Sequence, residues 1–169
     1  MINIDETIRA LSANAEAFRG LLQTVPADQG AWKPGPEIWS LHAVMQHMYN
    51  EERLDFRMHL REMFSDPPQP WGLIREEERE AGAKTVPDLA SALEGFLRER
   101  ADSIAWLRGL ESPDWEAVSR PPWGAIKAGD VLVSWVEHDF LHMRQLIEIL
   151  YALNVKLAEP YSVQYAGDW

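Results

Sequence analysis

Apolar residues recur at helical spacing through four long stretches of this sequence. The pattern predicts helices over residues 5–24, 41–64, 86–110 and 130–153. Side chains three and four positions apart share one face of a helix, so each stretch has one apolar face to bury. No stretch shows the sustained two-residue alternation of a half-buried strand. The sequence therefore predicts an all-α protein, a four-helix bundle with long structured loops and a C-terminal tail.

Residues that favour the N-cap position indicate where these helices begin. Asn3, followed three positions later by Glu6, indicates a capping box at the first helix. Ser40, Thr85 and Asp130 are the predicted N-caps of the second, third and fourth helices.

The remaining segments are shorter and more polar or aromatic. A charged stretch over residues 73–81 predicts a short exposed helix between the second and third long helices. The tail over residues 154–169 carries several aromatic residues, which predict that it packs on the bundle. The length of 169 residues fits one domain, spanning residues 1–169.

The net charge of −11 excludes some classes of partner. A surface this acidic repels phosphate groups, so we expect neither nucleic-acid binding nor a membrane-surface role. No apolar run approaches the roughly 20 residues that span a bilayer, and the first residues do not resemble a signal peptide. We therefore expect a cytoplasmic protein. The chain has no cysteine, so any metal site must use histidine or carboxylate ligands.

Two histidines four residues apart, His138 and His142, are the sharpest chemical signal. This spacing places both imidazoles on one side of the fourth helix, on the face that is otherwise apolar. Burying them costs free energy unless their nitrogens find partners. One metal ion would satisfy both, but hydrogen-bonded core histidines would satisfy the pattern as well.

Further polar residues on the second and fourth helices could complete a site. His47 lies on the flank of its helix, where it could face a cleft or solvent. Glu51, one turn later, could be a fourth ligand, a base behind the ligands or a solvated carboxylate. Glu52 and Asp139 fall on apolar faces, so each must be paired or functional. Asp139 could hold an arginine or orient a histidine.

Two segments resemble the DinB superfamily, the group that includes YfiT-like metal-dependent hydrolases. Residues 39–48 are like its Trp-Ser, six residues, His-Leu pattern, with Met48 in place of Leu, and residues 138–146 are like its His-x-x-x-His-x-x-Gln-Ile pattern, with Leu146 in place of Ile. The resemblance implies a four-helix bundle in which His47, His138 and His142 bind one divalent metal, commonly nickel or zinc. It also implies a homodimer. Known members include transferases and isomerases that act through low-molecular-weight thiols.

The ligand set suggests a mechanism. A divalent ion held by three imidazoles keeps open positions, and it lowers the pKa of a bound water or thiol. The hypothesis is a metal-dependent hydrolase or thiol transferase acting on a small molecule, with Glu51 and Glu52 as candidates for proton transfer. Histidine ligands suit zinc, nickel, copper and iron alike. The alternative is a non-enzymatic, stress-related binding or interaction module with a structural or vestigial metal site.

Overall fold

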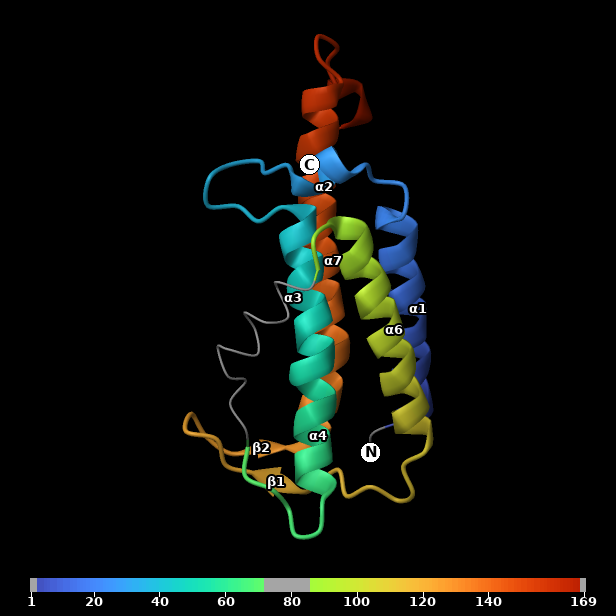
Figure 1. Cartoon of the computed structure of the whole chain (residues 1–169), viewed down its shortest axis with the longest axis vertical. Coiled ribbons are helices and arrows are strands. Elements are labelled where there is room, and N and C mark those ends of the chain that lie inside the picture. Colours follow the sequence, from blue (N-terminus) through green and yellow to red (C-terminus); the bar gives the residue numbers. More distant parts are fainter. Residues whose placement is uncertain (1–2, 72–85, 168–169) are drawn as a thin grey trace.

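The structure is a computed structural model that describes residues 3–71 and 86–167. Four helical columns lie side by side along the long axis (Figure 1). They are α1 (Ile4–Leu22), α3 (Leu41–Leu54) continued by α4 (Phe56–Phe64), α6 (Leu89–Arg108) and α7 (Ala128–Leu157). The predicted all-α four-helix bundle is confirmed. The predicted helix over residues 73–81 lies outside the described residues.

Shorter elements lie in the connections between the columns and in the tail. They are α2 (Ala27–Ala31), the strands β1 (Val118–Ser119) and β2 (Ile126–Lys127), and the 3-10 helix η1 (Gln164–Ala166). The two strands pair antiparallel, with Val118 opposite Lys127. This small hairpin lies beside the beginning of α7 (Figure 1).

Two of the predicted N-caps are confirmed. The Asn3 side chain accepts a hydrogen bond from the backbone N–H of Glu6 at 3.3 Å, and α1 begins at the next residue after Asn3. The Ser40 hydroxyl accepts from the backbone N–H of Ala43 at 3.1 Å and begins α3.

The other two predicted N-caps are wrong. The helix α6 is capped by Asp88, which accepts from the N–H of Ser91 at 2.8 Å, and not by Thr85. The residue before a proline avoids helical geometry, so Val86, ahead of Pro87, does not join the helix. The helix α7 already begins at Ala128, after the N-cap Lys127. Asp130 lies in its first turn and accepts from the N–H of Lys127 at 3.0 Å.

The predicted second helix is interrupted at Asp55, whose φ and ψ are −123° and −97°. Hydrogen bonds continue on both sides, because the Asp55 N–H donates to the Glu51 carbonyl and the Asp55 carbonyl accepts from His59. Neither proline nor glycine stands at the break, so no residue type in the sequence indicates it. Beyond it, the ring of Phe56 stacks on Trp135 of α7, with centroids 5.5 Å apart.

The buried apolar residues form two clusters along the bundle. One contains Phe18, Met45, Phe96 and Leu146, and the other contains Leu11, Leu60, Leu107 and Trp135, with their respective neighbours. In each of the four columns, buried polar residues lie between the two clusters along the chain. Four of them, one from each column, contact one another, and we call these the polar layer: Asn14, Glu52, Arg100 and Asp139.

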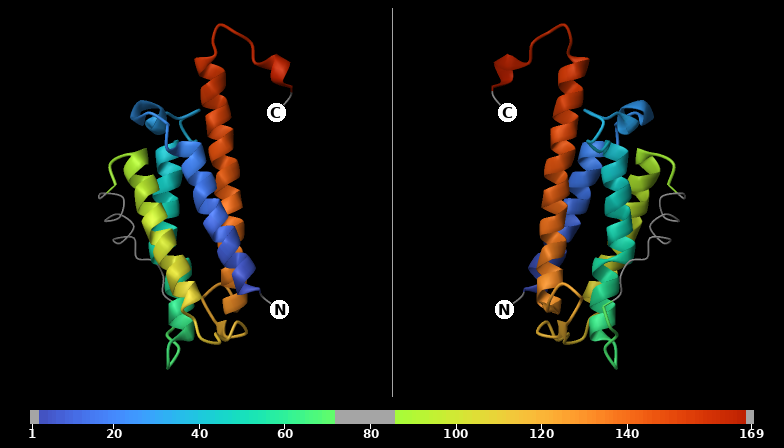
Figure 2. Two further views of the ribbon diagram at one scale, coloured as in Figure 1. Left: turned by 90° about the vertical axis from the view of Figure 1, so that its right-hand side faces the viewer. Right: turned by 90° about the vertical axis from the view of Figure 1, so that its left-hand side faces the viewer.

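The described part of the tail, up to residue 167, does not pack on the bundle, contrary to the sequence-based expectation. The helix α7 runs past the ends of the other helices, and the tail turns away from its tip (Figure 2). Tyr161 and Tyr165 are 82% and 103% exposed. Because α7 continues to Leu157, the tail begins beyond the ends of α1, α3 and α6. Within the described residues, no helix combines the length and the apolar character that a bilayer crossing requires.

Replacing two helical glycines by alanine should change the free energy of unfolding in opposite directions. A Cβ at Gly95 would come within 2.9 Å of the Tyr49 ring, so Gly95→Ala should lower the free energy of unfolding by about 1–3 kcal/mol through overpacking. A Cβ at Gly20 would meet no atom within 4 Å, so Gly20→Ala should raise it by about 0.5–1 kcal/mol. Urea unfolding of both variants measures the contrast. A stabilised Gly95→Ala protein would contradict the close α3–α6 packing.

Candidate metal centre

Three histidines from two helices converge between α3 and α7. Nε2 of His138 lies 3.3 Å from Nε2 of His47 and 3.1 Å from Nε2 of His142. One ligand atom from each histidine lies within 4.8 Å of the others, close enough for the three to hold one ion. We call these residues the three-histidine cluster. The spacing of His138 and His142 follows from one turn of α7, whereas His47 depends on where α3 lies.

Two of the three nitrogen separations fit a shared coordination shell. Two nitrogens bound to one zinc ion at about 2.0–2.1 Å in tetrahedral geometry lie about 3.3 Å apart. The observed contacts of 3.1 and 3.3 Å match this value.

The hydrogen bonding of the rings leaves lone pairs facing each other. Nδ1 of His142 lies 2.8 Å from the amide oxygen of Gln145, so that nitrogen donates and Nε2 carries no proton. A single proton on Nε2 of His138 could serve only one of its two neighbours. A cation placed among the three nitrogens would satisfy all of them.

Burial favours the neutral imidazoles that metals bind. Burial, together with the nearby His142, His47 and Arg100, lowers the pKa of His138 to about 3. Burial also lowers the pKa of His142, although its hydrogen bond to Gln145 and the charge of Asp139 offset part of the change. Both rings are therefore neutral near pH 7.

Glu51 and Trp39 both lie against His47, and Glu51 is on the side away from its converging nitrogen. Oε1 of Glu51 lies 3.6 Å from Nδ1 of His47, and Glu51 is buried rather than solvated. This separation is longer than a hydrogen bond, but a negative charge on this side of the ring favours the tautomer with its proton on Nδ1 and a free lone pair on Nε2. The Trp39 ring meets His47 edge-on, with centroids 5.4 Å apart.

Glu52 and Asp139 point into the bundle, where both bind Arg100 of α6. The guanidinium contacts the two oxygens of Asp139 at 2.7 and 2.8 Å and Oε2 of Glu52 at 2.9 Å. Trp135 donates from Nε1 to the same oxygen of Glu52 at 2.9 Å. The sequence-based inference that Asp139 holds an arginine is confirmed.

The helix α1 completes the polar layer. The amide of Asn14 donates to Asp139 at 3.1 Å, and the Leu11 carbonyl accepts from Arg100 at 3.2 Å. Burial alone would lower the pKa of Arg100, but the carboxylates of Glu52 and Asp139 outweigh it and hold that pKa above its usual range.

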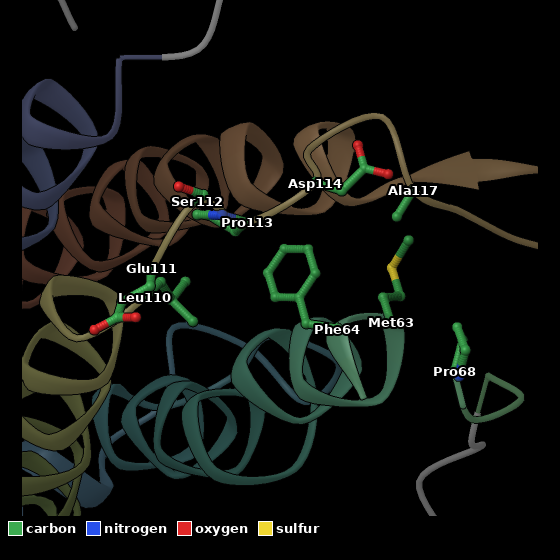
Figure 3. Close-up of a pocket in the computed structure, with 9 residues that line it drawn as sticks. All are labelled: Met63, Phe64, Pro68, Leu110, Glu111, Ser112, Pro113, Asp114 and Ala117. Carbon is green, nitrogen blue, oxygen red and sulfur yellow. The ribbon is translucent and has the colours of Figure 1, made fainter. Parts of the chain in front are cut away.

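A shallow hollow of about 290 Å³ opens beside His138. Its walls are formed mainly by Phe56 and Leu141, with Ser134 and Glu137 adding polar groups. A second hollow, of about 390 Å³, lies between the end of α4 and residues 110–117, with Phe64 and Met63 facing it (Figure 3). None of the described residues that line this second hollow is a histidine.

Comparison with known proteins places the chain in a family. The sequence model of the DinB superfamily matches residues 10–146, which is most of the chain. The chain belongs to the DinB superfamily. No curated protein matches its sequence significantly.

A solved structure shares the fold of this DinB-superfamily chain. It is YfiT from Bacillus subtilis, described as a probable metal-dependent hydrolase with an unusual four-helix bundle topology. The two are 15% identical in sequence, the match covers 91% of each chain, and the TM-score is 0.72.

Sequence reasoning on this DinB-superfamily chain missed Arg100 and Asn14. A signal was present, because Arg100 lies four residues after Phe96 and seven before Leu107, on the same face of its helix. A basic residue on an apolar stripe requires a buried acidic partner. The two acidic residues found on apolar faces, Glu52 and Asp139, are those partners.

Removing the Arg100 charge alone should destabilise the fold. Arg100→Met leaves two buried carboxylates without a counter-charge, so the free energy of unfolding should fall by about 3–5 kcal/mol. Arg144→Met is the matched control, because Arg144 is exposed and only approaches Glu148 at 3.5 Å. The control should unfold like the unmodified protein in urea. Equal stability of the two variants would contradict the role of the polar layer.

Proposed function

We propose that this protein is a metal-dependent enzyme in which His47, His138 and His142 bind one divalent ion. The convergence of three imidazole nitrogens at 3.1 and 3.3 Å is the observation that carries the proposal. The neutral state of the buried rings and the Gln145 hydrogen bond support it, because metals bind neutral imidazole. The family and the fold shared with a probable metal-dependent hydrolase point the same way.

We infer that nickel or zinc is the bound ion, with iron the next candidate. An ion of this kind lowers the pKa of a water or small thiol placed beside it. The side chains of this protein then orient the substrate and move the proton. The reaction is hydrolysis of a small molecule or transfer of a low-molecular-weight thiol.

Glu51 is the first candidate for proton transfer. It is buried beside His47, 3.6 Å from Nδ1, and it belongs to the helix turn that follows this histidine. Glu52 is the second candidate, although its Oε2 already accepts from Trp135 and Arg100. We therefore propose Glu51, before Glu52, as the residue that transfers the proton.

The hollow beside His138 favours a catalytic over a structural ion. Structural sites are closed by protein ligands, whereas catalytic sites leave a position for water or substrate. The largely apolar walls formed by Phe56 and Leu141 suit a substrate with an apolar portion. We propose that this portion lies in the hollow while the reacting group faces the three-histidine cluster.

Metal content and turnover together test the proposal. Protein purified without chelators should carry about one divalent ion per chain, and His142→Ala should lose it. His42→Gln is the control, because His42 lies on α3 but outside the cluster, and it should retain the ion. The loaded protein should then hydrolyse ester substrates or consume a small thiol with an electrophile. Native protein without metal would contradict the proposal, and a bound ion without any turnover would favour the interaction module.

The homodimer implied by the family is a second, separate prediction. Val133, Phe140 and Ile147 recur every seven residues along α7 and are 48%, 51% and 39% exposed. A second copy would bury this stripe. Light scattering at micromolar concentration should give the mass of two chains, and Phe140→Arg should halve it. Val118→Arg, at an exposed site on β1, should leave the mass unchanged. A monomeric native protein would refute the dimer.

A further inference from the structure

We propose that Arg100 is a positioning residue that sets the separation of α3 from α7, and with it the place of His47 in the three-histidine cluster. This inference rests on the proposed metal site. Arg100 touches none of the three histidine rings in hydrogen-bonding geometry. It acts through the two helices that carry them.

The contacts of Arg100 join those two helices at the level of the cluster. Its guanidinium holds both oxygens of Asp139, the residue next to His138 on α7. The same group holds Glu52 on α3, at 2.9 Å, five residues after His47. One rigid, planar group therefore spans from α3 to α7 through short ionic contacts.

The geometry makes His47 the ligand that depends on this span. His138 and His142 belong to one helix, so their spacing survives any shift of that helix as a body. His47 reaches them across the helix interface, at 3.3 Å from His138. A binding site keeps its function only when its groups stay within about 0.5 Å of the required geometry. A small change in helix separation would remove His47 first.

Stability alone does not explain the polar layer. A buried ion pair contributes little net stability compared with apolar residues of the same size. The layer is also incompletely paired, since Nε of Arg100 and Oε1 of Glu52 have no hydrogen-bond partner among the described residues. Apolar side chains there would simply have joined the two flanking clusters. The ionic contacts instead define a narrow range for the distance between α3 and α7.

A variant with an uncharged polar layer distinguishes a role of Arg100 in positioning His47 from a role in folding. The variant Glu52→Gln, Arg100→Met, Asp139→Asn leaves no unpaired charge, and it keeps oxygen acceptors for Trp135 and Asn14. We expect it to retain the helical circular dichroism of the unmodified protein. Cobalt(II) is the probe, because its visible absorption reports the number and geometry of nitrogen ligands and its titration gives the affinity.

The cobalt spectra give a result that a purely structural role would not produce. We expect the charge-free variant to bind cobalt at least about tenfold more weakly than the unmodified protein. Its spectrum should resemble that of His47→Ala, which lacks the ligand from α3. Arg144→Met, which removes an exposed arginine two residues from His142, should keep the native spectrum and affinity.

Two outcomes would overturn the inference in different ways. Native cobalt affinity and spectrum in the charge-free variant would overturn the positioning role and leave the metal site intact. Absence of cobalt binding by the unmodified protein would overturn the proposed function, and the inference with it. Arg100→Lys provides a second measurement, because it keeps the charge but loses the bidentate hydrogen bonds to Asp139. A folded Arg100→Lys protein with native affinity would also count against the inference.

Discussion

A single guanidinium buried between the four helical columns is the constraint on which the rest of the structure depends. Arg100 is 1% exposed, and a charge in that position is tolerated only if every neighbouring column supplies a partner. The column α3 supplies Glu52, α7 supplies Asp139, and α1 supplies the Leu11 carbonyl. Each helix therefore has a fixed register and rotation relative to the others, which apolar packing alone would leave less strictly defined. The two hydrophobic clusters then close the bundle above and below this level.

The same level of the bundle carries the candidate metal site, because adjacent residues on a helix point in different directions. His138 and Asp139 follow each other on α7, and the first meets the other histidines while the second meets Arg100. Glu51 and Glu52 do the same on α3, facing His47 and Arg100 respectively. Each of these two pairs of adjacent residues thus connects the interior ion pairs to the site at the helix interface. Because the two members of each pair share their backbone, we expect a change in the interior to alter the site.

The sequence predicted the features that local pattern controls and missed those that depend on distant residues. Helical periodicity gave the four columns, and N-cap chemistry placed Asn3 and Ser40 correctly. The break at Asp55 lacks any local breaker residue, and the tail was misjudged because its aromatics do not reveal how far α7 extends. Glu52 and Asp139 could be recognised as requiring a partner, but their common partner 39 or more residues away could not be named from spacing alone. The convergence of His47 with His138 joins positions 91 residues apart, so helical spacing alone could not show it, and only the resemblance to the DinB superfamily led us to expect it.

The hollow beside the cluster is connected to the polar layer through aromatic residues. Phe56 forms one wall of the hollow and stacks on Trp135, whose indole N–H donates to Glu52. Glu52 in turn is held by Arg100. The wall that a substrate would contact and the helix separation that brings His47 to His138 therefore depend on one set of buried charges. The shape of the hollow and the positions of the ring nitrogens are therefore coupled. A shift in one is expected to shift the other. This coupling also explains why an incompletely paired ionic group occupies a place that apolar residues could have filled.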